Sequence, residues 1–229
     1  YNISRKDQDQ FAYNSQIKAS KAQFSGRLAE EIIPIEIPQR KNDPIIFQHD
    51  EFIKKNTSLE VLGKLRTAFK KNGGTVTAGN ASGLNDGAAA MLLASEKGVK
   101  ENKLTPIAKI LSSAVVGVEP RIMGIGPVMA SNKALERAGL TMEDMDVIEL
   151  NEAFSAQALA CIREWGLEDN DPRINPNGGA IALGHPLGVS GTRILQTAAI
   201  ELKKQNKRYA LVTMCIGVGQ GYATIIERV

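Results

Sequence analysis

Two side chains able to exchange protons stand beside glycine clusters in this sequence. His185, one of two histidines, lies in residues 175–191, NPNGGAIALGHPLGVSG, a run that contains no acidic or basic side chain besides that histidine. Cys215, one of two cysteines, opens the cluster Cys-Ile-Gly-Val-Gly-Gln-Gly shortly after the apolar residues 209–212. Glycines allow backbone amides to approach a bound group closely, and imidazole and thiol groups act as acids, bases or nucleophiles near neutral pH. The pattern predicts a catalytic site built on His185 and Cys215.

Several of these residues also have structural explanations. Asn151 and Glu152 follow a predicted strand and can simply cap the next helix, a role that is compatible with catalysis. Ser82 and Asn80 have an alternative explanation as simple turn formers. Cys215 taken alone would more often be a buried structural thiol, but its place at a strand end before glycines favours a functional role. His49 lies in a charged, proline-containing loop, and we expect it to be solvated.

Nucleotide and metal sites are not indicated. The glycines at 217–221 follow a strand, but a dinucleotide site requires a helix after them, whereas residues 222–226, YATII, favour a strand. These glycines more plausibly form a tight turn that lets a substrate approach the backbone. Two isolated histidines and two distant cysteines lack the spacing of metal ligands, so no metal is expected.

Composition restricts the class of protein. The chain has 229 residues, 43% of them hydrophobic, which is enough for a core in one large or two small domains. A net charge of +3 and 5% aromatic residues give no case for a nucleic-acid partner. No apolar run approaches the ~18 residues of a membrane helix, and no signal peptide opens the chain. With no disulfide framework either, we expect a cytoplasmic protein without a membrane partner.

The hydrophobic pattern alternates between helical and strand periods, which favours an α/β fold with covered sheets. Helices are expected at residues 4–25, 58–71, 155–165 and 191–204, with a further one capped by Ser131 and ended by Gly139. The helix at 58–71 would bury Leu59, Leu62, Leu65 and Phe69. Strands are expected at 31–38, 107–118, 145–150, 209–214 and 221–228, with two more within 74–95 and an exposed loop at 39–50.

Four motifs, taken together, resemble the thiolase family. They are GNASGLNDGAA at 79–89, NEAF at 151–154, GGAIALGHPLG at 178–188 and CIG at 215–217. They occur in the family's order, and the similarity runs almost continuously over residues 74–229. The wording DPRINPN at 171–177 and the ending CIGVGQG look most like the 3-oxoadipyl-CoA (β-ketoadipyl-CoA) thiolases of aromatic-compound degradation.

The resemblance implies a thiolase fold, in which two similar α/β halves stack as layers of helices and sheets. Residues 107–229 would be the C-terminal half, 74–106 the last strands of a largely missing N-terminal half, and 1–73 the end of the loop domain that covers CoA. The chain opens on Tyr1, already at the edge of a helix, so we expect it to be the latter part of a longer protein. Family members are usually dimers or tetramers, so a homodimer or homotetramer is expected for that protein.

Thiolases cleave a 3-oxoacyl-CoA with free CoA, or run the reverse condensation, through a covalent acyl-cysteine. That nucleophile belongs to the N-terminal half, and neither Cys161 nor Cys215 matches its motif. This chain by itself is therefore expected to be inactive. CoA is implied as a substrate, and no permanently bound cofactor is expected.

The resemblance also implies a role for each matching residue. Cys215 would be the acid and base that protonates the departing acetyl-CoA carbanion. His185 would activate the nucleophile and contribute to an oxyanion hole that Asn151 completes by holding a water, and the Gly217 amide would help form a second hole. The positions expected near the pantetheine arm of CoA are Ala78, Ser82 and Phe154.

Other functions stay open at this stage. An acetoacetyl-CoA thiolase or a general 3-ketoacyl-CoA thiolase would share all four motifs. A non-catalytic thiolase-like protein that binds a lipid or acyl chain need not keep Asn151, His185 and Cys215 together, and this sequence has all three. A purely structural fragment is the remaining alternative.

Overall fold

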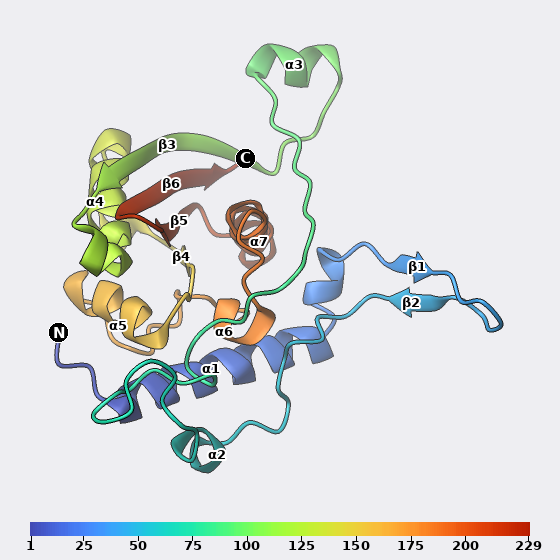
Figure 1. Ribbon diagram of the computed structural model, residues 1–229. Helices are drawn as coiled ribbons and strands as arrows, with labels where there is room; N and C mark the ends of the chain where they lie inside the picture. Colours follow the sequence, from blue (N-terminus) through green and yellow to red (C-terminus); the bar gives the residue numbers. More distant parts are fainter.

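The computed structural model describes residues 1–229 and contains a four-stranded mixed sheet in the order β3-β6-β5-β4 (Figure 1). Its strands are β3 (Ala108–Gly117), β4 (Val147–Leu150), β5 (Tyr209–Ile216) and β6 (Gln220–Arg228). β6 pairs antiparallel with both β3 and β5, and β4 runs parallel to β5. The predicted α/β class and these strands are confirmed, including the terminal strand pair.

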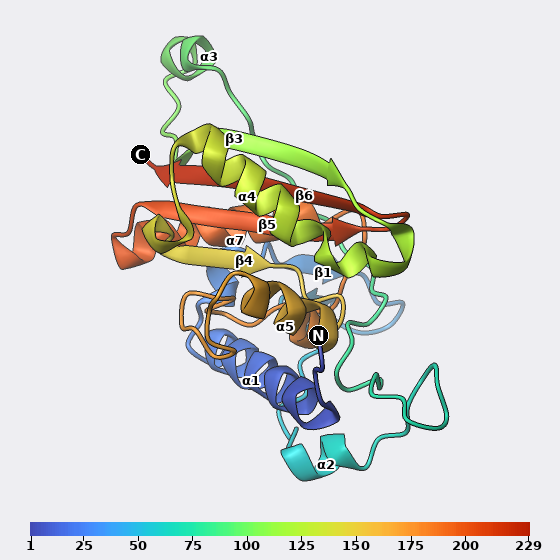
Figure 2. The ribbon, with the colours of Figure 1, turned by 90° about the vertical axis from the view of Figure 1, so that its left-hand side faces the viewer.

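Helices cover both faces of this sheet. Successive residues of a strand point to opposite sides, so neighbouring residues pack against different helices. Leu211 of β5 belongs to the core shared with α4 (Gly126–Ala138) and α5 (Ser155–Glu164). Its neighbours Ala210 and Val212 pack instead with residues of α7 (Ser190–Gln205). Figure 2 shows α4 in front of the sheet and α7 behind it.

The N-terminal helix α1 (Arg5–Phe24) lies against α5, α6 (Ala180–Leu183) and α2 (Leu59–Gly63) (Figure 1). Ser4 caps it through a capping box with Asp7, as predicted, and Gly26 follows its end with φ +80°. None of the helices is both long enough and apolar enough to span a membrane. The remaining short helices are η1 (Leu28–Glu30), α3 (Glu96–Glu101), η2 (Pro120–Ile125) and η3 (Met142–Asp144).

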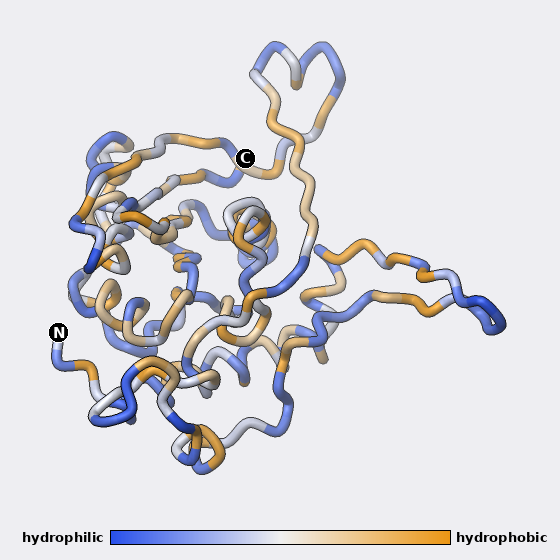
Figure 3. The backbone as a smooth tube through the Cα atoms, viewed as in Figure 1, coloured by the Kyte–Doolittle hydropathy of each residue, from blue (hydrophilic) through white to orange (hydrophobic).

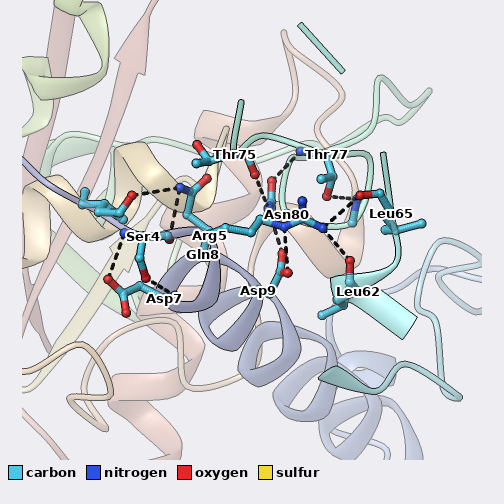
Figure 4. A network of polar contacts seen from close by, with 12 residues as sticks. Ser4, Arg5, Asp7, Gln8, Asp9, Leu62, Leu65, Thr75, Thr77 and Asn80 are labelled. Carbon is cyan, nitrogen blue, oxygen red and sulfur yellow. Dashed lines mark hydrogen bonds and ion pairs between the residues drawn. The ribbon is translucent and has the colours of Figure 1, made fainter. Parts of the chain in front are cut away.

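The helix predicted at 58–71 is wrong in extent, since α2 ends at Gly63. Arg5 of α1 donates from Nη2 to the carbonyl oxygens of Leu62 (2.7 Å) and Leu65 (3.1 Å), which satisfies carbonyls at the helix end (Figure 4). Of the predicted stripe only Leu62 is buried, whereas Phe69 is 78% exposed. A side chain from another helix thus binds the carbonyl groups at the point where α2 ends, after five residues.

The two strands predicted within residues 74–95 are also wrong. Residues 87–95 run extended but form no named strand, and Leu92 and Leu93 are exposed. A strand requires the backbone groups of a neighbouring chain segment, and this segment has none beside it. Before it, Asn80 is a turn former: its Oδ1 accepts from Thr77 N at 2.8 Å, and its Nδ2 donates to Asp9 at 2.9 Å (Figure 4).

Two further expectations need correction. Ser131 does not cap a helix, because α4 begins five residues earlier at Gly126, with a proline in its first turn that suits a helix start. Gly139 does end that helix, in the left-handed conformation at φ +67°. The predicted loop at 39–50 contains a short strand, β2 (Ile45–Phe47), which pairs antiparallel with β1 (Ile35–Ile37). This hairpin projects from the body and is largely apolar along its strands (Figure 3).

Candidate active site

Parallel neighbours β4 and β5 place Asn151 and Cys215 at one edge of the sheet. Leu150, the last residue of β4, is in register with Thr213 of β5, and Asn151 N donates to Thr213 O at 3.0 Å. Cys215 comes two residues later on β5. The carboxyl ends of parallel strands meet at the same edge, which is where α/β sheets commonly hold their ligands.

A loop that follows α6 brings His185 to Asn151. Its backbone N–H donates to the carbonyl of Gly83 (3.1 Å) and to Oδ1 of Asn85 (3.3 Å), so the 79–89 motif holds the histidine motif in place. Gly184 has φ +90°, and a Cβ there would lie 2.4 Å from Oδ1 of Asn85. Only glycine fits this position, which explains one glycine of the sequence motif.

The imidazole of His185 lies between two side chains. Its Nδ1 is 2.6 Å from the Oγ of Ser190, and its Nε2 is 3.4 Å from the Nδ2 of Asn151. The Ser190 hydroxyl donates to the carbonyl of Pro186 at 3.2 Å, so it accepts a hydrogen bond from Nδ1–H. The proton of the neutral ring is therefore on Nδ1, and the lone pair of Nε2 faces Asn151.

Ser190 was not predicted as a site residue from the sequence. It stands five residues after His185 as the first residue of α7, and the spacing alone does not show that its hydroxyl turns back to the ring. The one pattern that could have indicated it is a serine at the start of the helix that follows the glycine-rich histidine loop.

Burial lowers the pKa of His185, and the positive charge of Arg193 lowers it further. The ring is thus kept in its neutral form at pH 7. A neutral imidazole whose Nε2 lone pair is directed into the site is suited to accept a proton.

Cys215 is a buried free thiol at the end of β5. Burial raises its pKa, so it carries its proton at pH 7 and is in the form that donates one. Gly217 lies exposed in the turn after it, and Gly219 takes φ +91° where a Cβ would lie 2.2 Å from the carbonyl of Val118. The glycine cluster is a tight turn between β5 and β6, as predicted.

The second cysteine is a structural thiol. Cys161 is fully buried on α5, and its Sγ donates to the carbonyl of Gly124 at 3.3 Å. Burial raises its pKa to about 12, which keeps it from forming a thiolate at neutral pH. This environment agrees with the expectation that Cys161 is not a nucleophile.

Two of the three residues expected near the pantetheine arm lie together. Ser82 donates from both N (3.0 Å) and Oγ (3.2 Å) to the carbonyl of Ala153. Phe154, the next residue, packs edge to face with Phe69 at a ring separation of 6.3 Å. Ala78 lies exposed in the preceding turn, and no contact joins it to the other two.

The helix after the NEAF motif is not capped by Asn151 or Glu152. Its N-cap residue is Phe154, which makes no side-chain capping bond, so the capping alternative is wrong. Asn151 Oδ1 is buried without a hydrogen-bond partner in the chain. A free buried acceptor beside His185 is an arrangement suited to holding a water or a ligand group.

Comparison with family models matches residues 104–228 to the thiolase C-terminal domain and residues 1–97 to the thiolase N-terminal domain. The chain belongs to the thiolase family. Among curated relatives, this thiolase chain is 57% identical over 229 residues to the beta-ketoadipyl-CoA thiolase of Acinetobacter baylyi, covering all of this chain and 57% of that protein. It is 59% identical over 227 residues to the 3-oxoadipyl-CoA/3-oxo-5,6-dehydrosuberyl-CoA thiolase of Escherichia coli K12, covering 99% of this chain and 56% of that protein.

Solved structures agree with the thiolase fold. The acetyl-CoA acetyltransferase of Bacillus anthracis superposes with a TM-score of 0.95 at 43% identity, over 100% of this chain and 57% of that one. Human mitochondrial 3-ketoacyl-CoA thiolase in complex with CoA superposes with a TM-score of 0.93 at 48% identity, over 99% and 55%. The thiolase chain therefore spans somewhat more than half the length of the relatives that it matches.

Proposed function

We propose that this chain supplies the proton-transfer groups of a thiolase that cleaves 3-oxoadipyl-CoA with CoA into succinyl-CoA and acetyl-CoA. The observation that supports the proposal is the position of Asn151: its Nδ2 lies 3.4 Å from Nε2 of a neutral His185, and it follows the strand parallel to the one that ends near the protonated thiol of Cys215. The choice of substrate is supported by relatives at 57% and 59% identity that are named for that compound.

The first step forms the acyl-enzyme. We place the nucleophilic cysteine in the part of the protein that corresponds to the rest of the relatives' length. His185 Nε2 accepts the proton of that thiol, and the thiolate attacks the C3 carbonyl of the substrate. Asn151, with its unpartnered Oδ1, holds the water that together with His185 stabilises the developing oxyanion.

The second step releases acetyl-CoA. The bond between C2 and C3 breaks, its electron pair passes to C2, and the Cys215 thiol protonates this carbanion while the Gly217 amide stabilises the thioester oxygen. An incoming CoA thiol then gives its proton to Cys215 and its sulfur to the acyl group. The nucleophilic cysteine leaves as a thiolate and recovers its proton from His185.

The remaining parts of the proposal concern the whole protein. Residues 1–73 form the end of the CoA-covering loop domain, 74–106 belong to the N-terminal half, and 107–229 form the C-terminal domain. Ser82 and Phe154 contact the pantetheine arm, and Ala78 lies along the same path. We infer a cytoplasmic homodimer or homotetramer that uses CoA as a substrate and keeps no cofactor.

Thiolysis by the protein that carries this chain together with the nucleophilic cysteine tests the proposal. Loss of the 3-oxoacyl-CoA absorbance would be followed with 3-oxoadipyl-CoA and with acetoacetyl-CoA, and the products separated by chromatography. We expect a higher kcat/KM for 3-oxoadipyl-CoA. A preference for acetoacetyl-CoA would contradict the substrate assignment, and no turnover of either compound would contradict the activity.

A further inference from the structure

A buried carboxylate next to Asn151 joins three separate parts of the chain. Glu152 is 1% exposed, and its Oε2 accepts hydrogen bonds from Ser15 Oγ at 2.7 Å and from Ile181 N at 3.2 Å. Its Oε1 accepts a bond from Asn175 Nδ2 at 2.7 Å. These donors come from α1, from α6 and from the loop before α6, so one carboxylate ties all three to the end of β4.

Two of these contacts lead directly to the proposed catalytic residues. Ile181 lies on α6, which ends at Leu183, two residues before His185. Asn175 also holds the strand that leads into Asn151, because its Oδ1 accepts from Leu150 N and its Nδ2 donates to Leu150 O, both at 2.9 Å. The segments that deliver Asn151 and His185 are thus hydrogen-bonded to the same side chain.

The glycine pair of the 178–188 motif leaves room for this arrangement. A Cβ at Gly179 would lie 2.3–2.7 Å from the carboxylate carbon and oxygens of Glu152. A Cβ at Gly178 would lie 2.7 Å from the Ser15 carbonyl oxygen of α1. Distances this short are not tolerated, so both glycines are required for Glu152 and α1 to reach α6.

We propose that Glu152 is a positioning residue that sets the separation of Asn151 and His185 by holding the β4 end and α6 at a fixed distance. It acts through these two residues and does not contact the substrate. A displacement of about 1 Å between reacting groups costs up to about 10²-fold in rate, so a carboxylate that fixes two segments matters to the chemistry. The consequence for catalysis rests on the proposed function, but the positioning does not.

The test uses the two histidines of the chain as reporters. In protein labelled with ¹⁵N-histidine, His185 is buried beside Asn151 and Ser190, whereas His49 is exposed and gives a reference signal from the same sample. Glu152→Gln keeps the size of the side chain but turns an NH2 group toward one of its donors. Gly179→Ala displaces the carboxylate without removing a hydrogen-bonding group.

Glu201→Gln is the matched control. Glu201 is also a buried carboxylate, and it accepts bonds from Arg27 (2.9 Å) and Asn177 (2.7 Å), but it contacts neither the β4 end nor α6. We expect Glu152→Gln and Gly179→Ala to shift the His185 ring signals and to abolish the Nδ1–H resonance, while His49 is unchanged. Glu201→Gln should lower the melting temperature without either change.

Two results would overturn the proposal. One is a wild-type His185 spectrum in Gly179→Ala or in folded Glu152→Gln, and the other is the same spectral change in Glu201→Gln. Ser15→Ala, which removes only the α1 donor, provides a milder variant if both others fail to fold, and it should shift the His185 signals in the same direction. In the protein with the nucleophile, Glu152→Gln should lower kcat by about 10²-fold with little change in KM. If the wild-type protein were inactive, the proposed function would be refuted. The positioning role of Glu152 would still be supported by a shift of the His185 signals in the variants.

Discussion

The hydroxyl oxygen of Ser190 lies 2.6 Å from Nδ1 of His185, and this contact decides which ring nitrogen carries the proton. Because the same hydroxyl donates to Pro186 O, it accepts a hydrogen bond from Nδ1–H, and the Nε2 lone pair then accepts one from Asn151 Nδ2. A base that must take a proton from a thiol needs that tautomer. In the proposed mechanism, the serine therefore sets the tautomer in which His185 can act as a base.

Replacing this serine tests the assignment. We expect Ser190→Ala to shift the His185 ring toward the Nε2–H tautomer and to slow acylation of the nucleophile by about tenfold, because the base is then protonated on the wrong atom. The ¹⁵N chemical shifts of the two ring nitrogens report the tautomer directly. Ser131→Ala is the control, since Ser131 is also fully buried but its Oγ has no hydrogen-bond partner. An unchanged tautomer in Ser190→Ala would contradict the assignment.

The titration of His185 gives a second prediction. Burial and the charge of Arg193 lower its pKa below the ordinary value of 6.5, so the NMR midpoint should fall below 6.5 and rise again in Arg193→Gln. The unfolded chain takes up a proton on this histidine at a higher pH than the folded protein does. The stability that His185 contributes is therefore lost as the pH falls below 6.5. A midpoint at or above 6.5 in the wild type would show that the ring is not desolvated.

A buried carboxylate on β4 predicts an opposite dependence on pH. Burial raises the pKa of Glu149 from 4.5 to about 8, and neither of its oxygens has a hydrogen-bond partner. The folded protein keeps this proton up to about pH 8, whereas the unfolded chain releases it near pH 4.5, so rising pH favours unfolding in that window. In Glu149→Gln, the fall in the free energy of unfolding with rising pH should be smaller by up to about 1.4 kcal/mol per pH unit.

Urea unfolding at several pH values between 5 and 8 measures this effect. Glu149→Gln should flatten the decline, whereas Glu136→Gln, the same substitution at an exposed helix position, should leave the slope unchanged. Parallel curves for Glu149→Gln and the wild type would mean that Glu149 is ionised in the folded protein.

Cys215 should be needed for proton transfer but not for acylation. In the protein that carries the nucleophilic cysteine, Cys215→Ala should abolish thiolysis, because the C2 carbanion then has no proton donor. An acetyl adduct should still accumulate with acetyl-CoA, because His185 activates the nucleophile and CoA can leave as a thiolate without an acid. Mass spectrometry of the intact protein detects the adduct. Its absence in the variant would show that Cys215 takes part in the first step, contrary to the proposed division of roles.

His185 should be needed for that first step. His185→Asn keeps a polar side chain of moderate size but no base, and we expect acylation to slow by about 10²-fold or more. Rapid-quench measurement of the acyl-enzyme gives the rate. Acylation at the wild-type rate would make His185 a packing residue.

The sequence by itself determined the features that depend on residues close together in the chain. The capping box of Ser4 and Asp7, the left-handed helix end at Gly139 and the alternation of Ala210, Leu211 and Val212 are local, since dihedral preferences and side-chain periodicity set them. Motif types also predicted that Asn151, His185 and Cys215 belong together. These motifs carried the information because few residue types can perform the chemistry.

Only the tertiary structure decided what depends on distant partners. Arg5, a side chain from another helix, binds the carbonyl groups at the end of α2. Residues 87–95 form no strand because a strand needs a hydrogen-bonding neighbour. Ser190 and Glu152 acquired their importance in the same way, through contacts with His185, Ser15 and Ile181. A hydrogen bond is short and directional, so its existence follows from how the chain packs and not from the residue types alone.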